Sequence, residues 1–246
     1  MEVRMQAGSL SGHRFILVCC ALLAGVWIVP AFSIDDDPAK APLARNEPRH
    51  HLLFRNEFVR IMRIVIPPGE STLWHEHDFD YFVLFVNGSK LHVDTQANPQ
   101  GVDTTVASKS FGYTTYAGKR FVHRVHDTDT TINHQLAFEI IPPNPIGFAV
   151  SDRSAAPQYK MEMDNDRIRV WRLQLAPGGI AGLITQKAPG IRFILSGDRL
   201  VETHGDGQVN EIAIKSGDYA WLPGAASRSL ANVGPSPLEL VEIELK

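Results

Sequence analysis

The chain has 246 residues, of which 44% are hydrophobic and 21% are charged, with 24 Lys and Arg residues against 27 Asp and Glu residues. This composition excludes a disordered polymer and a multi-span membrane protein, and the adjacent positions of the two cysteines, Cys19 and Cys20, exclude a disulfide scaffold. The charge is nearly balanced and no basic run is interleaved with aromatic residues, so we expect no nucleic-acid partner.

Residues 1–33 have the layout of a secretory signal peptide. Two arginines precede an apolar stretch over residues 15–29, and small residues at Ala31 and Ser33 place the cleavage site before Ile34. The stretch is short for a spanning helix, which needs about 20 apolar residues. We therefore expect an exported protein, periplasmic or secreted, that keeps no stable membrane span after cleavage. A retained N-terminal anchor is the alternative.

Residues 34–49 are rich in Asp, Ala and Pro, a composition that predicts a solvated linker. The rest of the chain contains short runs of β-branched and aromatic residues that end at turn residues, and helical periodicity is hard to find. The predicted strands include residues 59–66, 81–86, 135–141, 167–175, 191–195 and 238–245. Many short strands with regular turns indicate an all-β sandwich, jelly roll or barrel.

Two parts of this β region repeat one another. Residues 56–63 align with residues 165–172, and the Pro-Gly turn that follows the first run recurs after the second. Matches at turn residues and at strand-face apolar positions in one register are hard to obtain by chance. We therefore expect two copies of one β unit, at residues 50–145 and 156–246, joined by a proline-rich segment.

Histidines distinguish the first copy from the second. His75 and His77 stand at positions i and i+2 of a predicted strand, so both imidazoles point to the same face, although an exposed polar face is the alternative. His123 follows about one hairpin pair downstream and is preferred to His126, which has the opposite strand parity. Three convergent neutral imidazoles would bind a first-row divalent metal.

The residues around these histidines resemble a known family. His75 and His77, with the glycines that flank them, have the spacing of the first cupin motif, and residues 117–127 around His123 are similar to the second. The resemblance implies an all-β fold of two tandem cupin-type jelly-roll barrels, also called double-stranded β-helices. It also implies that the three histidines hold one divalent ion, Fe, Mn or Zn, inside the first barrel.

The sequence departs from the cupin pattern in both copies. Where cupins usually carry a metal-binding Glu, the first copy has Tyr81, with Asp80 beside it on the opposite strand face. In the second copy Ile184, Gln186 and Arg228 stand at the positions of the three histidines, so we expect that copy to bind no metal. An ion held by three neutral histidines keeps its full charge, which favours hydroxide, an anionic substrate or a chelating oxygen ligand.

Tyr81 is the candidate catalytic residue, because among the nearby acid and base groups it alone has the strand parity to face His75 and His77. It would either bind the ion as a phenolate or donate a hydrogen bond to a bound water or substrate. His50, His51 and His134 are isolated from this pattern, so we interpret them as solvated or locally hydrogen-bonded.

Three functions remain open. The first is a metalloenzyme that acts on a small polar or anionic substrate by dioxygenase, isomerase, lyase or hydrolase chemistry. The second is a non-catalytic cupin that captures a small molecule or a metal. The third is a structural or assembly role without a metal, in which the second barrel serves as a scaffold. A homodimer is the default oligomer for such a protein.

Overall fold

The protein is described by a computed structural model that covers residues 37–142 and 147–246. The predicted signal peptide at residues 1–33 lies outside the described residues. Two short 3₁₀ helices, η1 (Pro38–Lys40) and η2 (Ala44–Asn46), precede the first strand. Within these two described ranges, no helix is long and apolar enough to cross a membrane.

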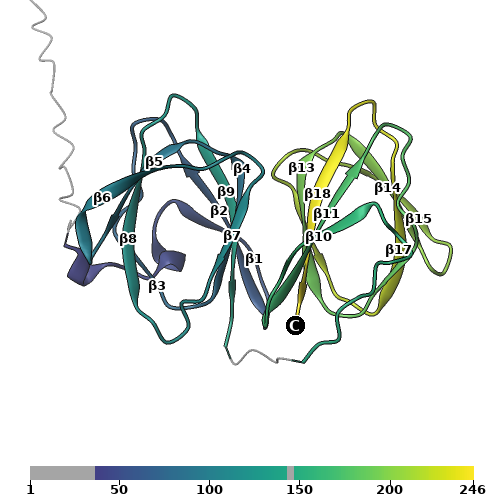
Figure 1. Ribbon diagram of the computed structural model, residues 1–246, viewed down its shortest axis with the longest axis horizontal. Helices are drawn as coiled ribbons and strands as arrows, with labels where there is room; N and C mark the ends of the chain where they lie inside the picture. Colours follow the sequence, from purple (N-terminus) through teal and green to yellow (C-terminus); the bar gives the residue numbers. More distant parts are fainter. Residues whose placement is uncertain (1–36, 143–146) are drawn as a thin grey trace, which may run out of the picture. The chain divides into compact units, whose positions relative to one another are not determined.

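The first barrel consists of two antiparallel sheets (Figure 1). One sheet has five strands in the order β1-β2-β9-β4-β7, and the other has four in the order β3-β8-β5-β6. The strands are β1 (His50–Arg55), β2 (Val59–Ile66), β3 (His75–His77), β4 (Tyr81–Asn87), β5 (Lys90–Thr95), β6 (Asn98–Thr105), β7 (Phe111–Thr114), β8 (Phe121–Asp127) and β9 (Asn133–Ile140).

The second barrel repeats this arrangement. Its sheets run β10-β11-β18-β13-β16 and β12-β17-β14-β15. The strands are β10 (Tyr159–Asp164), β11 (Ile168–Leu175), β12 (Ile184–Gln186), β13 (Gly190–Ser196), β14 (Arg199–His204), β15 (Val209–Ala213), β16 (Tyr219–Leu222), β17 (Ala226–Asn232) and β18 (Leu238–Leu245). The predicted all-β class, with two jelly-roll barrels in tandem, is confirmed.

Several strands are apolar on both faces, and β4 shows why. Its residues Phe82 and Leu84 enter a buried cluster that also contains Phe193 and Ile243 of the second barrel, whereas Tyr81 belongs to a separate cluster inside the first barrel. Because both faces of such a strand are covered, its sequence is a continuous apolar run rather than an alternating one. The packing of the two five-stranded sheets against each other thus explains the run at residues 81–86.

The N-terminal segment, residues 37–49, is not the solvated linker that its composition predicted. Ala44 and Glu47 are buried, and the backbone N–H of Glu76 in β3 donates to the carbonyl of Pro42 at 2.8 Å. Leu43 also forms a parallel bridge with Glu76. Since β3 is the edge strand of its sheet, it has unpaired backbone groups that this segment covers. The hydrogen-bonding groups of this open sheet edge therefore hold the segment against the barrel.

Candidate metal centre

Three histidines converge inside the first barrel because of the register between β3 and β8. His75 pairs directly with His123, and His77 lies two residues further along β3 on the same face. Each of the three histidines has one ring nitrogen that lies within 4.8 Å of a ring nitrogen of both other histidines. The structure thus brings together all three histidines that the sequence singled out.

One pair of nitrogens in this three-histidine site has the spacing that a bound cation requires. Nε2 of His77 lies 3.0 Å from Nε2 of His123. Two nitrogens that each lie about 2.1 Å from one ion, at an angle of about 90–110°, would be about 3.0–3.4 Å apart. Nδ1 of His75 lies 2.9 Å from the carbonyl oxygen of Leu73, so as a donor it leaves Nε2 free to bind a metal. Nδ1 of His77 is buried without a hydrogen-bond partner.

The electrostatics of the site favour neutral imidazoles. Burial lowers the pKa of His75 to about 3, and the neighbouring His50 adds to this shift. Burial also lowers the pKa of His77 and that of His123 well below the ordinary value, and His75 adds to both shifts. A neutral imidazole carries the lone pair that a metal requires, so protons compete weakly for these nitrogens near neutral pH.

Tyr81 lies at the start of β4 and faces the site, as its strand parity predicted. Its ring centroid is 4.4 Å from that of His77, and the residue is buried. Burial raises the pKa of Tyr81 well above its ordinary value, and the nearby Glu139 adds to the shift. Without a metal the side chain is therefore a neutral phenol, able to donate a hydrogen bond.

Two other candidates point away from the three-histidine site. Asp80 accepts hydrogen bonds from the Tyr113 hydroxyl and the Ala117 backbone N–H, both at 3.1 Å. His126 lies with Nε2 2.7 Å from Oδ2 of Asp94. The choice of His123 over His126 from strand parity agrees with this placement.

Sequence reasoning missed a buried carboxylate that the N-terminal segment delivers beside the site. Oε2 of Glu47 lies 2.6 Å from Nδ1 of His50, whose ring centroid is 4.7 Å from that of His75. Oε1 of Glu47 accepts the backbone N–H of Leu73 at 3.0 Å, and the Leu73 carbonyl is the partner of His75. His50 is locally hydrogen-bonded, as expected, but it also borders the three-histidine site. In the sequence, only the three-residue spacing between Glu47 and His50 indicates that these two side chains could form a hydrogen bond.

A second carboxylate, Glu139, is the cross-strand neighbour of Tyr81. The two residues are directly opposite in the β4–β9 register. Glu139 is fully buried and forms an ion pair with Arg60. Nη1 of Arg45 lies 4.0 Å from Oε1 of Glu139 and forms a closer ion pair, at 2.7 Å, with Asp78. Burial raises the pKa of Glu139, and the two arginines oppose that shift. Tyr81 therefore lies beside a buried carboxylate, one oxygen of which is paired with Arg60 and the other of which has no hydrogen-bond partner among the residues that the structure describes.

The second barrel has a different interior at the matching position. Ile184 pairs with Arg228 in the β12–β17 register, as His75 pairs with His123 in the first barrel. The Arg228 guanidinium donates to Gln186 and, at 2.9 Å, to Glu242. The predicted replacements for the histidines therefore occupy the expected places, and a cation there would meet the positive charge of Arg228.

Glu242 is the centre of a buried ion network in that barrel. Arg153 donates to Glu242 at 2.7 Å and to Glu244 at 2.6 Å, and Arg192 donates to Glu242 at 2.8 Å. Burial alone would raise the pKa of Glu242, but the three neighbouring arginines reverse the shift and lower it. Arg153 lies upstream of residue 156, where the second copy was expected to begin, so the barrel interior includes part of the joining segment.

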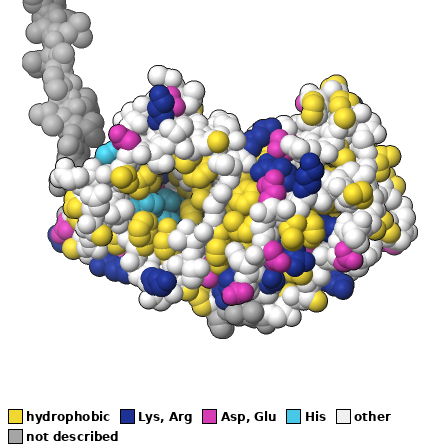
Figure 2. Space-filling model, viewed as in Figure 1, with side chains coloured by type: hydrophobic (Ala, Val, Ile, Leu, Met, Phe, Trp, Pro, Cys, Tyr) yellow, Lys and Arg dark blue, Asp and Glu magenta, His cyan; other side chains and the backbone are white. Residues whose placement is uncertain are grey.

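In the three-histidine site His123 is partly exposed, whereas His75 and His77 are buried. In Figure 2 histidine side chains are visible at the floor of a hollow in the first barrel, surrounded by hydrophobic side chains. A mostly apolar hollow with a few polar groups at its base is typical of sites for small molecules.

Comparisons with known proteins rest on structure alone. No family model matches the chain, and no curated protein matches its sequence. Among solved structures, AerE from Microcystis aeruginosa aligns with a TM-score of 0.57 and 12% identity, over 81% of this chain and 98% of that one. Salicylate 1,2-dioxygenase from Pseudaminobacter salicylatoxidans aligns with a TM-score of 0.56 and 11% identity, over 80% and 76% of the two chains.

A variant of oxalate decarboxylase from Bacillus subtilis aligns with a TM-score of 0.55 and 12% identity, over 77% of this chain and 69% of that one. At these identities the likeness shows the fold alone, which these solved structures share with the present chain. The chain consists of two jelly-roll barrels in tandem.

Proposed function

We propose that this protein is an exported metalloenzyme whose first barrel binds one divalent ion, Fe, Mn or Zn, through His75, His77 and His123. The observation that carries the proposal is the convergence of three neutral imidazoles, two of them with nitrogens 3.0 Å apart. Such an ion would act as a Lewis acid, or a redox centre if it is iron or manganese, for a ligand in its open positions.

The substrate class that we propose is a small organic acid. Three neutral ligands leave the positive charge of the ion uncompensated in its first coordination sphere, which favours an anionic oxygen donor. Two structures that share the fold are named for reactions of carboxylates, oxalate and salicylate. The hydrophobic rim of the hollow suits a compact organic molecule better than a polymer.

The chain's own residues have distinct parts in this proposal. Tyr81 donates a hydrogen bond from its hydroxyl to an oxygen of the substrate, since its phenol is neutral and adjacent to His77. The Leu73 carbonyl holds the His75 ring in orientation, and Glu47 holds Leu73. The buried walls exclude water around the reacting group, which strengthens each polar contact there.

Metal analysis of untagged protein tests the proposal directly. We expect about one ion per chain, lost in the double variant His75→Ala/His77→Ala. A metal-free protein that gains no metal on incubation with Fe²⁺, Mn²⁺ or Zn²⁺ would reject the proposal.

Turnover then separates an enzyme from a binding protein. We expect product formation or oxygen uptake with at least one member of a panel of small carboxylic acids. Tight binding of an acid to the metal-loaded protein without any product would instead support a non-catalytic cupin that captures small molecules.

Export and assembly need separate measurements. N-terminal sequencing of protein recovered from the periplasm or medium of the expressing cells should start at Ile34 if the signal is cleaved as we propose. Light scattering of the purified protein tests the proposed homodimer. Recovery only from the membrane fraction would favour the retained anchor.

A further inference from the structure

A second cavity lies in the other barrel, away from the three-histidine site. Its volume is about 220 Å³, and it is lined by four branched aliphatic side chains of the second barrel together with a small set of polar ones. The branched aliphatic residues are Ile194, Leu200, Ile212 and Ile214. A cavity of about 150 Å³ is sufficient for benzene, and drug-sized ligands occupy about 300–1,000 Å³, so this space suits one small apolar group.

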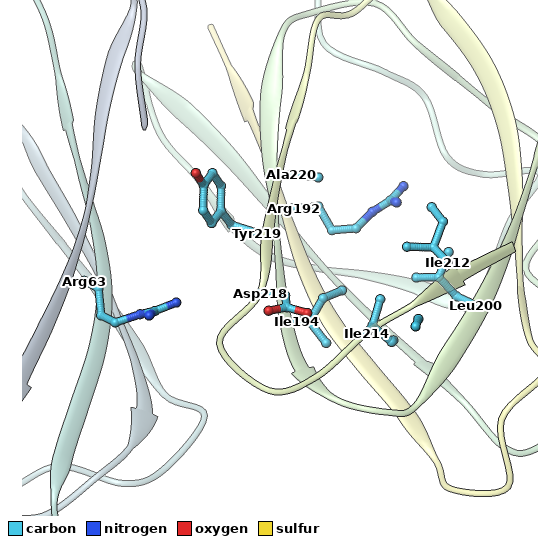
Figure 3. A pocket seen from close by; sticks show the side chains of 10 residues that line it. Arg63, Arg192, Ile194, Leu200, Ile212, Ile214, Asp218, Tyr219 and Ala220 are labelled. Atoms are coloured by element: carbon cyan, nitrogen blue, oxygen red, sulfur yellow. The ribbon is translucent and has the colours of Figure 1, made fainter. Parts of the chain in front are cut away.

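Arg63 of the first barrel extends into the mouth of this cavity (Figure 3). Its Nε is buried without a hydrogen-bond partner, and no ion pair involving its guanidinium is found within residues 37–142 and 147–246. An arginine in such surroundings is a site for a carboxylate, which accepts two parallel N–H bonds from the guanidinium.

The second barrel shows what Arg63 lacks. Arg172 is its counterpart there, since the two arginines pair with Leu136 and Val241 at matching places in their sheets. Arg172 donates to Glu162 and to Glu239, both at 2.7 Å. In the strand registers of the first barrel, Leu53 stands at the position of Glu162 and His134 stands at the position of Glu239. A carboxylate from outside the chain would restore the missing partner of Arg63.

Asp218 supplies the opposite charge at the same mouth. Its carboxylate points toward the Arg63 guanidinium across a gap in Figure 3, and the two groups form no direct ion pair in the described part of the chain. Oδ2 of Asp218 accepts one backbone N–H, from Lys215 at 2.9 Å. A cation and an anion that face each other across a gap are complementary to a ligand that carries both charges.

Arg192 borders the inner part of the cavity. Its Nε and Nη1 donate to Glu242 and Glu202, so its charge is already balanced, and its Nη2 is buried without a partner. Its guanidinium lies beside Leu200 and Ile212 in Figure 3. The inner end is therefore aliphatic apart from one N–H donor of Arg192 that has no partner within the described ranges.

We propose that this cavity binds a free α-amino acid with an apolar side chain. The ligand carboxylate bonds Arg63, its ammonium group bonds Asp218, and its side chain fills the space between Ile194 and Ile214. Both charges of the ligand are then paired when it moves from water into the cavity. A zwitterion can bind in a partly apolar site only if both of its charges are paired there. The site needs no metal and is distinct from the proposed enzymatic one.

Calorimetry on the full chain, in buffer that contains a metal chelator, tests this site independently of the three-histidine site. We expect saturable binding of L-leucine or L-phenylalanine. Glycine, 4-methylpentanoate and isoamylamine, which lack the side chain, the ammonium group and the carboxylate respectively, should each bind at least tenfold more weakly. No binding of either amino acid at millimolar concentration, or equal binding of 4-methylpentanoate, would overturn the proposal.

Two charge-removing variants locate the site. Arg63→Gln and Asp218→Asn should each weaken amino-acid binding at least tenfold. Arg199→Gln is the matched control, because it removes an exposed arginine that bonds Glu211 at 3.1 Å in the same barrel and does not line the cavity. Unchanged affinity in both cavity variants would exclude this location. Circular dichroism spectra should show that each variant is folded.

Discussion

Oε2 of Glu47 lies 2.6 Å from Nδ1 of His50, and both residues are buried beside the proposed metal ligands. The pair brings a carboxylate to the barrel that holds the three histidines, in which Tyr81 stands at the position where the resemblance implied a Glu. It reaches the site from the N-terminal segment rather than from a strand of the motif. Because Glu47 also holds Leu73, whose carbonyl bonds His75, it acts on the ligand geometry through two contacts.

Glu47→Gln should therefore weaken metal binding without abolishing it. Loss of the carboxylate removes a negative charge near the ion and loosens Leu73, and losses of outer-shell partners of this kind cost about 10–100-fold in metal affinity. Competition with a fluorescent chelator measures the effect. Glu76→Gln is the control, since Glu76 lies between His75 and His77 but pairs with Arg120 on the other face. Equal affinities for both variants would show that Glu47 has no part in the site.

His123→Ala and His126→Ala should separate the metal site from the neighbouring polar cluster. His123 is a proposed ligand, so its loss should remove the ion or lower its affinity by several orders of magnitude. His126 bonds Asp94 outside the three-histidine site, so His126→Ala should keep about one ion per chain. Elemental analysis after gel filtration gives the ratio. Retention of metal by His123→Ala would contradict the proposed ligand set.

Tyr81→Phe distinguishes the two roles considered for Tyr81. If the neutral phenol donates to the substrate, the variant should keep its metal affinity within about threefold but bind a carboxylate ligand about tenfold more weakly, because a hydrogen bond to a charged group contributes about 1.5–3 kcal/mol. Titration of the metal-loaded protein with oxalate or salicylate measures the ligand affinity, and competition with a fluorescent chelator measures the metal affinity. A large loss of metal affinity would instead assign Tyr81 as a ligand.

Glu242→Gln should destabilise the second barrel and change how its stability depends on pH. Breaking a buried ion network by removing one partner costs about 3–5 kcal/mol. Since the folded-state pKa of Glu242 lies below the ordinary 4.5, its contribution is present above that pH and is lost as the pH falls toward the folded-state value. Urea unfolding between pH 7 and pH 3 should show a shallower decline for the variant, and a parallel decline would contradict the assignment.

The sequence predicted the three histidines better than their surroundings. The i and i+2 spacing of His75 and His77 fixes their common face on any strand, so no tertiary information was needed. Glu47 was missed because the Asp, Ala and Pro around it indicate a solvated segment, and its burial depends on the open edge of β3. Glu139 lay within a predicted strand, but its position opposite Tyr81 follows from the β4–β9 register.

By itself, the sequence determined the all-β class, the repeat of one β unit and the face shared by His75 and His77. These features follow from local rules, which are the two-residue period of a strand and the backbone demands of turns. Only the tertiary structure decided that His123 lies opposite His75, that Arg228 joins Glu242, and that Arg63 faces Asp218 across a cavity. Each of these depends on pairing or packing between segments far apart along the chain, and local sequence patterns carry little information about such contacts.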